Sequence, residues 1–521
     1  MNNTVEQTPL ESKHIRLRDT TDMAALKSEI TLRPKRHFDP RKMMALTFLV
    51  LIVIGTVLLV TPWAQASGKW AWLNTSPVFS WHAFFHAVLD NLFMATSTAC
   101  VTGLTVVNVA TYYSTFGHAV LLCCIQLGGL SLVTIGTLIV TILLGRVPVS
   151  GEDQVMINYG ANSLNRANRL LTQTICYVFS FECIGAILLF CRHYWAHGYD
   201  LGKSIWYAGF HAVSAFCNAG VSLYENNLVA VQHDMLYSLI IATLVTIGGI
   251  GFLVLANLFH YRPWTKDLRD RGRLTLHSRI VLWTTFYLCF AGGLLFTALE
   301  WNHSLNFTEI PPFWQPLLEH NWAACWESIS IAGERLCVGL SQAAIHRTAG
   351  FNFIEMADIT PPANLLSVFF MLVGGSPGSM AGGLKTTTLV ILILTIRAYL
   401  RGAPTVHLNK RTISDSICRE AMVIIFYYLL MVFTFYFILL LTEAALQAEM
   451  GDFVLFYEVS SAIGTVGLSL NATPLLSPTG KCLISLAMFL GRIGPISIAF
   501  MMARREISHR IRYPEETITV G

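Results

Sequence analysis

The segment SAIGTVGLS, residues 461–469, interrupts the apolar C-terminal quarter of the chain with a Thr-Val-Gly tripeptide. Glycine costs about 1 kcal/mol relative to alanine in a helix interior, and it readily adopts positive φ. Thr465-Val466-Gly467 therefore predicts a helix break where the flanking sequence is apolar enough to cross a membrane.

The composition predicts an all-α polytopic membrane protein. Of the 521 residues, 54% are hydrophobic and 13% are charged, whereas a soluble domain carries about 25% charged residues. Apolar stretches long enough to cross a hydrocarbon core about 30 Å thick recur eight times. These predicted spans are residues 43–64, 116–145, 170–191, 235–260, 280–300, 364–396, 421–446 and 480–503.

Positive side chains concentrate in alternate connections between these spans. Of the 35 lysines and arginines, 27 lie in the N-terminal tail, the loops 146–169, 262–279 and 397–419, and the C-terminal tail from Arg504. Because such residues favour cytoplasmic loops, we expect both termini inside and a multi-pass protein of the plasma (inner) membrane. The tail before residue 43 lacks the apolar core of a secretory signal, and the net charge of +4 requires no nucleic acid partner.

Motifs for enzymatic chemistry are absent from the sequence. The twelve cysteines show neither a disulfide framework nor zinc-ligand spacing. No H-E-x-x-H motif, nucleophile elbow or Cys/His cluster occurs. We therefore expect a protein that is not an enzyme.

Four segments of 17 residues in the outer connections align without gaps and end in glycine. Each has a bulky residue ten positions before the glycine, and a small residue six positions before it. The segments are AVLDNLFMATSTACVTG (87–103), SIWYAGFHAVSAFCNAG (204–220), ERLCVGLSQAAIHRTAG (334–350) and GDFVLFYEVSSAIGTVG (451–467).

A glycine pair follows each of the first three segments, at Gly128-Gly129, Gly248-Gly249 and Gly374-Gly375, and Gly491-Arg492 takes this place after the fourth, all at 24 to 28 residues from the segment's last glycine. Near-constant spacing indicates a repeated unit. We expect four parallel span, pore-loop, span repeats with pseudo-fourfold symmetry around a central pore. The expected divisions are an N-terminal tail (1–42), repeats at 43–146, 147–260, 261–399 and 400–505, and a C-terminal tail (506–521).

Non-helical backbone at membrane depth is tolerated only where protein buries it or where it lines a watery cavity. Four glycine turns around one axis would form a ring of carbonyl oxygens that replaces the water shell of a dehydrated cation. A single such glycine is better explained by helix packing. Four glycines in register favour the carbonyl ring.

These segments resemble the Trk/Ktr/HKT superfamily of potassium transporters, and most closely its Ktr branch. The resemblance rests on HRTAGFN (346–352), TVG (465–467), GGSPGSMAGGLKT (374–386) and YPEE (513–516). It implies a potassium selectivity filter with one glycine in each repeat. The implied filter residues are Val101, Thr102, Gly103, Asn218, Ala219, Gly220, Thr348, Ala349, Gly350, Thr465, Val466 and Gly467.

The resemblance also implies ions and partners. The plant sodium-selective members carry serine at the first filter glycine, so Gly103 favours potassium, with a sodium-permeable member and sodium dependence left open. No covalent cofactor is expected. A membrane homodimer and a cytosolic nucleotide-binding regulatory ring are implied, with the nucleotide on that partner subunit.

The stretch GGSPGSMAGGLKTTT cannot form a continuous helix because it holds five glycines and a proline. We assign residues 374–384 as an intramembrane gate on the cytoplasmic side, as the resemblance implies. A phosphate-binding loop is the alternative, but one residue too many separates its glycine from Lys385. The expected gate residues are Gly374, Gly375, Ser376, Pro377, Gly378, Ser379, Met380, Ala381, Gly382, Gly383 and the intramembrane Arg492.

Several charged residues have open roles. Glu458, Asp90 and Asp452 are expected to gather cations at the outer mouth, and for Asp90 and Asp452 helix capping is an equal alternative. Arg347 is expected to point away from the pore toward a carboxylate, and Glu182 is left unassigned. A secondary transporter of a small solute is the competing function, although such proteins usually carry inverted repeats.

Overall fold

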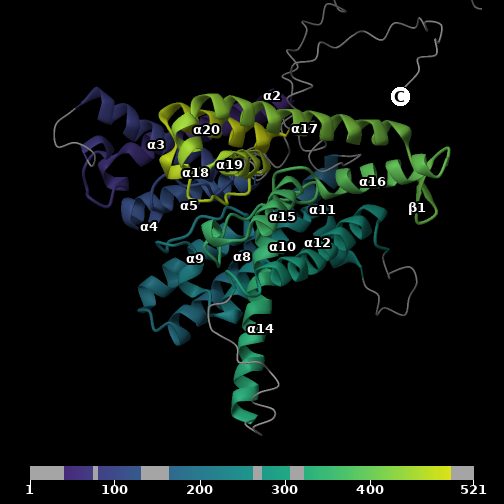
Figure 1. Cartoon of the computed structure of the whole chain (residues 1–521), viewed down its shortest axis with the longest axis horizontal. Helices are drawn as coiled ribbons and strands as arrows, with labels where there is room; N and C mark the ends of the chain where they lie inside the picture. The colour runs from purple at the N-terminus through teal and green to yellow at the C-terminus, as the bar shows by residue number, and fades with distance from the viewer. Residues whose placement is uncertain (1–39, 74–79, 131–163, 262–272, 306–321, 495–521) are drawn as a thin grey trace, which may run out of the picture. The chain divides into compact units, whose positions relative to one another are not determined.

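The computed structural model describes residues 40–73, 80–130, 164–261, 273–305 and 322–494. This part of the chain is predominantly α-helical, as the sequence predicts (Figure 1). Both predicted tails fall largely outside the described residues. The long helices are α2 (Pro40–Val60), α3 (Trp81–Ala99), α5 (Thr115–Leu130), α8 (Leu164–Cys191), α9 (Leu201–Phe216), α10 (Met235–Ile250), α11 (Phe252–His260), α12 (Leu276–Glu300), α14 (Trp322–Ile345), α15 (Pro361–Leu372), α16 (Thr386–Leu400), α17 (Asp415–Thr442), α19 (Asp452–Gly464) and α20 (Pro478–Ile493).

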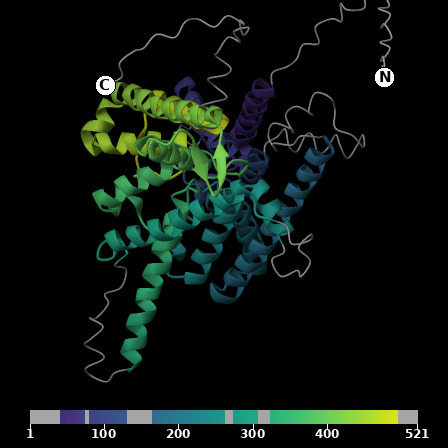
Figure 2. The ribbon, with the colours of Figure 1, turned by 90° about the vertical axis from the view of Figure 1, so that its right-hand side faces the viewer.

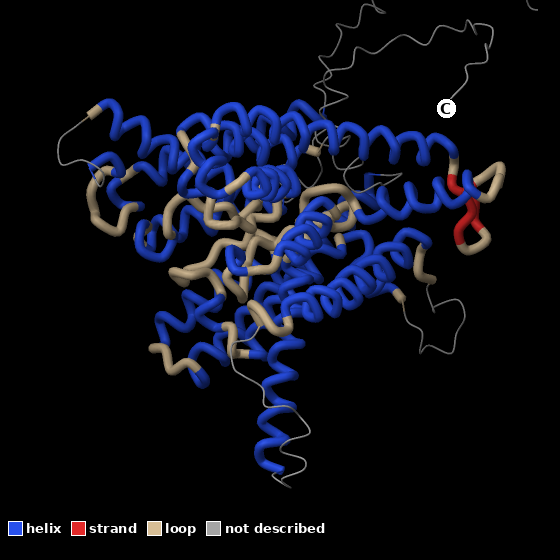
Figure 3. The backbone as a smooth tube through the Cα atoms, viewed as in Figure 1, coloured by secondary structure: helices blue, strands red, loops and turns tan. Residues whose placement is uncertain are grey.

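The shorter elements join these helices. Helices α4 (Val109–Tyr112) and α18 (Ala444–Met450) precede α5 and α19. Strands β1 (Val406–Leu408) and β2 (Arg411–Ile413) pair antiparallel, with Val406 opposite Ile413. This hairpin connects the ends of α16 and α17, which pack side by side (Figure 2 and Figure 3).

Three helical stretches in the described residues are long and apolar enough to cross a membrane: Thr172–Ala196, Leu276–Glu300 and Asp415–Thr442. The bent pair of α10 and α11 makes a fourth if it counts as one span. Shorter apolar helices lie at Ala45–Val60, Thr115–Leu130, Pro361–Leu372 and Thr386–Leu400. The count of eight spans, their repeat symmetry and the orientation of the termini stay predictions.

The predicted span over residues 235–260 is bent in the structure. Helices α10 and α11 meet at 96°. Gly251 between them has φ of +95°, and the Phe252 N–H donates to the Gly378 carbonyl at 2.9 Å. The chain turns here because a distant loop supplies the acceptor for the start of α11.

Residues 364–396 also break. Helix α15 ends at Leu372 and α16 begins at Thr386, so the glycine-rich stretch between them is a loop. An isolated parallel bridge pairs Val373 with Leu384 at its base. The two ends of the loop therefore lie side by side.

Helices α3, α9, α14 and α19 contain most of the four aligned segments and end a few residues before their last glycines, and we call them the turn helices. The helix that follows each turn packs against the next turn helix along the chain. The contacts are α5 with α9, α10 with α14, α15 with α19, and α20 with α3. The last contact joins the end of the chain to its beginning, so the four packing contacts form a closed circuit.

Glycines allow these helices to approach closely. A Cβ added at Gly128, Gly248 or Gly491 would strike a backbone carbonyl oxygen at the C-terminal end of a turn helix. The oxygens struck belong to Ala99, Phe216 and Ile463, each four residues before a turn glycine. Gly374 departs from the pattern, because its Cβ would strike the Gly382 carbonyl within the same loop.

Polar side chains fix the helix starts. Two buried carboxylates tie helices together: the Thr360 N–H donates to Glu300 at 2.9 Å, and the Ser477 N–H donates to Glu443 at 3.2 Å. A carboxylate at a helix N-terminus is favourable because the first N–H groups have no partner within the helix. The N-caps of α9, α10, α12 and α20 are Asp200, Asp234, Thr275 and Ser477.

Gly251→Ala tests the bend. A Cβ at this position would lie 2.8 Å from both the Pro377 carbonyl and the Ser376 hydroxyl, and this backbone conformation costs a non-glycine residue about 1–3 kcal/mol. We expect a lower apparent melting temperature in detergent. Gly209→Ala in α9 is the control, since nothing lies within 4 Å of its added Cβ. Equal melting of the two variants would contradict the strained bend.

Candidate functional site

The four glycine turns meet. We name them turn 1 (101–103), turn 2 (218–220), turn 3 (348–350) and turn 4 (465–467). A Cβ added at any of the four glycines would come within 2.8 Å of the carbonyl oxygen that precedes the glycine of another turn. Gly103 meets Ala219, Gly220 meets Ala349, Gly350 meets Val466, and Gly467 meets Thr102. The order 1, 2, 3, 4, 1 closes a ring.

The backbone of each turn is strained in the same way. The first residue of every turn has positive φ, between +50° and +79°, and the glycine has φ between +67° and +101°. Three of the first residues are β-branched, namely Val101, Thr348 and Thr465, for which this conformation is a genuine outlier. Alternating φ signs gather successive N–H groups on one side of a chain, which leaves the carbonyl oxygens to face the other side.

Hydrogen bonds to the turn helices stabilise the strained backbone of the turns. The N–H groups of Thr102, Ala219 and Val466 each donate to the carbonyl of the residue five positions earlier, at 2.7 to 2.8 Å. In turn 1 the Gly103 N–H donates to the Ser97 hydroxyl, and in turn 4 the Gly467 N–H donates to the Ser461 hydroxyl, both at 3.0 Å. The small residue six positions before the glycine is therefore a hydrogen-bonding partner, which the pattern of sizes did not reveal.

Turn 3 is held differently because Ala344 occupies the serine position. The Phe353 N–H beyond the turn donates to the Gln342 side chain at 2.9 Å, and Asn227 donates to the Gly350 carbonyl at 3.3 Å. His346 bonds the Gln342 carbonyl and the Ser367 hydroxyl. Supports for turn 3 thus come from several elements rather than from one serine.

The structure gives Arg347 partners other than the candidate carboxylate. Its guanidinium donates to the Cys289 sulfur at 3.3 Å and to the Gly374 carbonyl at 3.5 Å, and no carboxylate pairs with it among the described residues. Arg347 is buried. It therefore links turn 3 to the start of the glycine-rich loop.

A cavity of about 430 Å³ opens on one side of the ring. Polar side chains dominate its lining, among them five asparagines and two carboxylates, Glu225 and Glu355. Burial, and to a smaller degree the nearby Asp358 carboxylate, raises the pKa of Glu355. The residues two positions beyond the four turn glycines all line this cavity: Thr105, Ser222, Asn352 and Ser469.

The glycine-rich loop lies against the turns and the glycine pairs. The Ser376 and Met380 N–H groups donate to the carbonyls of Gly249 and Gly248, at 3.1 and 3.3 Å. A Cβ added at Gly382 would strike the Thr465 side chain of turn 4. The loop is therefore in contact with the ring.

Arg492 joins this loop to α5. Its guanidinium donates to the Met380 carbonyl at 2.5 Å and to the Gly128 carbonyl at 2.7 Å. The neighbouring group Lys385 donates to the Ala381 carbonyl at 2.8 Å. Two cations thus bind carbonyl oxygens of the loop itself.

The acidic residues considered at the outer mouth are engaged within the protein. Asp90 forms an ion pair with Lys481 at 2.7 Å, and Asp452 accepts from Gln447 at 2.8 Å. Glu458 is fully buried and accepts from the hydroxyls of Ser469 and Thr473. The carboxylates that line the cavity, Glu225 and Glu355, were not identified from the sequence.

Glu182, left unassigned above, is buried in α8. It accepts from the Gln126 amide at 3.2 Å and from the Cys217 thiol at 3.7 Å. Cys217 is the C-cap residue of α9. The carboxylate therefore lies behind turn 2.

This arrangement suits a desolvated monovalent cation. Backbone carbonyls are hard oxygen ligands, and the C-terminal ends of helices carry a partial negative charge. The hydroxyls of Thr102 and Thr465 in the ring are buried without a hydrogen-bond partner in the described part of the chain. No cluster of three or more His, Cys, Asp or Glu side chains suited to a metal ion occurs in these residues.

Comparison with known proteins agrees with this chemistry. The sequence matches the TrkH family of cation transport proteins over residues 47–510. It is 30% identical to the potassium/sodium uptake protein NtpJ of Enterococcus hirae, over 94% of this chain and 99% of that protein. It is 31% identical to the Ktr system potassium uptake protein B of Bacillus subtilis (strain 168), over 93% of this chain and 97% of that protein.

The fold is similar to the crystal structure of the potassium transporter TrkH from Vibrio parahaemolyticus. The TM-score is 0.61 over 92% of this chain and 89% of that chain, at 16% sequence identity. This TM-score establishes a shared fold.

Two adjacent, fully buried serines test the support of turn 4. Ser461→Ala removes the acceptor of the buried Gly467 N–H, which costs about 1–3 kcal/mol. Ser460→Ala removes only a bond to the Phe456 carbonyl of its own helix, which contributes about 0.5–1.5 kcal/mol. We expect Ser461→Ala to lower the melting temperature in detergent further than Ser460→Ala does. The reverse order would contradict this support.

Proposed function

Because the chain belongs to the TrkH family of cation transport proteins, we propose that it takes up potassium through a pore whose selectivity filter is the ring formed by turns 1 to 4. The ring closure described above is the observation that carries the proposal. Ions would move inward down the membrane potential, which contributes about 2.3 kcal/mol per charge for each 100 mV. The family consists of ion transporters, not enzymes.

The filter residues are the twelve of the four turns. Carbonyl oxygens of Thr102, Ala219, Ala349 and Val466 lie beside the neighbouring turn glycines, which supports their role as ion ligands. The hydroxyls of Thr102 and Thr465, buried without a hydrogen-bond partner in the described part of the chain, would supply further oxygens within turns 1 and 4. The carboxylates of Glu225 and Glu355 would raise the local cation concentration in the outer cavity.

Potassium is the favoured ion, with sodium as the alternative. A glycine occupies all four ring positions, and Gly103 stands where the resemblance places serine in sodium-selective plant proteins. The relative from Enterococcus hirae is named for both ions. Sodium permeation or sodium dependence therefore belongs to the proposal as the second possibility.

We assign the gate to residues 374–384 together with Arg492. The loop follows turn 3 in the chain, contacts turn 4, and is bound by the Arg492 guanidinium. A fixed positive charge beneath the filter would repel a cation from resting there. Release of the loop from Arg492 would then open the path.

The proposed setting is the plasma (inner) membrane, with four span, pore-loop, span repeats and both termini cytoplasmic. The repeat boundaries are those predicted from the sequence, and the alternation of basic loops supports the orientation. A homodimer and a cytosolic regulatory ring that binds the nucleotide are part of the proposal. The Ktr system name of the relative from Bacillus subtilis supports a partner subunit.

Gly467→Ser tests the filter. The added side chain would strike the Thr102 carbonyl, so we expect rubidium uptake by a potassium-uptake-deficient cell to fall at least about tenfold, equivalent to about 1.4 kcal/mol. Gly209→Ser is the control, because open space surrounds Gly209. Unchanged uptake by Gly467→Ser at equal protein amount would exclude the carbonyl filter.

Arg492→Gln tests the gate. The loss of the charge and of the bonds to Met380 and Gly128 is expected to raise the maximal rubidium uptake rate several-fold, with little change in KM, since the filter is untouched. Arg397→Gln at the exposed end of α16 is the matched control. An uptake rate equal to or below that of the wild type, in protein that folds, would remove Arg492 from the gate.

A further inference from the structure

Two of the turn helices carry a hydrogen-bond acceptor nine positions before the turn glycine. In α19 it is Glu458, and in α9 it is His211. Both side chains are fully buried. Each bonds the serine two positions beyond its own turn glycine, Ser469 and Ser222 respectively.

Glu458 spans the outer side of turn 4. The Ser469 hydroxyl donates to one carboxylate oxygen, and the Thr473 hydroxyl donates to the other at 2.7 Å. Ser461, three residues later on the same helix face, accepts from the Gly467 N–H. Turn 4 is therefore held on both sides of its glycine by one face of α19.

His211 does the same for turn 2. Its Nδ1 lies 2.8 Å from the Tyr207 carbonyl, so Nδ1–H donates there and Nε2 is left as the acceptor. Nε2 lies 3.0 Å from the Ser222 hydroxyl and accepts from the Leu223 N–H at 3.3 Å. Ser214, three residues later, donates to the Val221 carbonyl at 2.8 Å.

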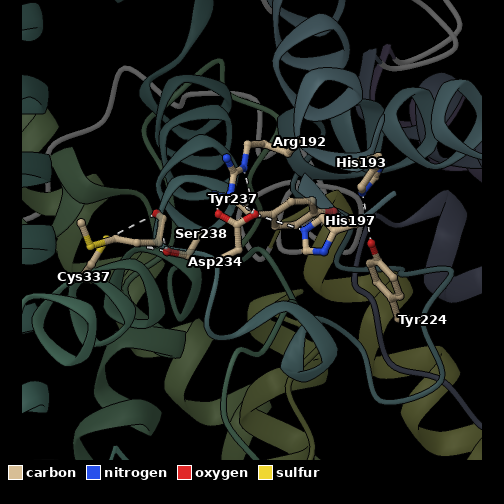
Figure 4. Close-up of polar contacts among 9 residues, drawn as sticks. Arg192, His193, His197, Tyr224, Asp234, Tyr237, Ser238 and Cys337 are labelled. Atoms are coloured by element: carbon tan, nitrogen blue, oxygen red, sulfur yellow. Dashed lines mark hydrogen bonds and ion pairs between the residues drawn. The ribbon is translucent and has the colours of Figure 1, made fainter. Parts of the chain in front are cut away.

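The support of turn 2 continues outward. The Tyr224 hydroxyl bonds His193 Nε2 at 3.1 Å (Figure 4). In the same view, Asp234 accepts from Arg192 at 2.9 Å and bonds His197 at 3.1 Å. These bonds connect the segment between turn 2 and α10 to the residues that follow the C-terminal end of α8.

Turns 1 and 3 have no side chain nine positions before the glycine that bonds the residue two positions beyond it in the described part of the chain. Met94 stands nine positions before Gly103 and has no polar group to offer. Ser341, at the equivalent position before Gly350, lines a separate cavity between α10 and α14. Since each turn contacts the turns before and after it in the ring, turns 2 and 4 face each other across the axis.

We propose that Glu458 and His211 are positioning residues that set the width of the filter across its diagonal, and thereby its preference for potassium over sodium. The proposal rests on the proposed function, because a ring of carbonyls discriminates ions through the distance and number of its oxygens. Ser222 and Ser469 transmit the position, since each lies between a buried acceptor and the outer cavity.

The test substitutes the serines and leaves the buried acceptors in place. Ser469→Ala and Ser222→Ala remove one hydroxyl each, and Ser469→Thr and Ser222→Thr retain it. Ser460→Ala is the control, a buried serine that bonds only its own helix. The readouts are the KM for rubidium uptake and the sodium concentration that halves the rate of rubidium uptake. Both are measured for the full chain in uptake-deficient cells.

Each alanine variant is expected to raise the rubidium KM and to lower the half-inhibiting sodium concentration by about three- to tenfold, the effect of one lost hydrogen bond. The double alanine variant should exceed either single variant, while the threonine variants and Ser460→Ala retain wild-type values. A merely structural role would lower the amount of active protein and the maximal rate and leave the sodium-to-rubidium ratio unchanged.

Wild-type ratios in the double alanine variant, with wild-type uptake intact, would overturn the positioning role alone. Absence of rubidium uptake by the wild-type chain would instead overturn the proposed function, and this inference with it. The two failures are distinguished by the wild type and Ser460→Ala, which carry no change at the ring.

Discussion

Main-chain carbonyl oxygens gathered at four glycine turns are the constraint on which this structure depends. Hydrocarbon offers no hydrogen-bond donor to a carbonyl oxygen, so such groups persist at membrane depth only where protein surrounds them or water reaches them. Turns 1 to 4 satisfy this condition jointly, because the carbonyl of each turn lies beside the glycine of another. No single turn could do so alone. The closed circuit of helix contacts therefore follows from the turns, which need four separate parts of the chain to meet.

The turns also require compensation for strain. A β-branched residue at positive φ is unfavourable by about 1–2 kcal/mol, and Val101, Thr348 and Thr465 all adopt it. The hydrogen bonds that the Gly103 and Gly467 N–H groups donate to the hydroxyls of Ser97 and Ser461 offset part of this cost. Turn 3 has no equivalent serine, and its supports come from Gln342, Asn227 and Arg347 instead. The four turns share a backbone shape while the side chains that hold them differ, so the ring is not fourfold in its chemistry.

The sequence predicted those features that local residue chemistry determines. The register of the four glycines, the breaks at Gly467 and Pro377, and the importance of Arg492 could each be read from spacing or from a charge in an apolar run. The 96° bend at Gly251 was not predicted, because the acceptor for the Phe252 N–H is the Gly378 carbonyl, more than 100 residues further along the chain. The partner of Arg347 and the burial of Glu458 were missed for the same reason. Both depend on which distant segments pack together, and periodicity contains no such information.

The glycine pairs connect the ring of turns with the glycine-rich loop. Gly128, Gly248 and Gly491 lack side chains, so their helices approach the last carbonyls of the turn helices. The same absence leaves backbone carbonyls of these pairs accessible to other donors. Met380 and Ser376 take those of Gly248 and Gly249, and Arg492 takes that of Gly128. A loop anchored on these carbonyls cannot shift without changing contacts at the base of the turn helices, and Gly382 against Thr465 extends this coupling into turn 4 itself. The ring and the glycine-rich loop therefore share one set of main-chain groups and are not separate parts of the protein.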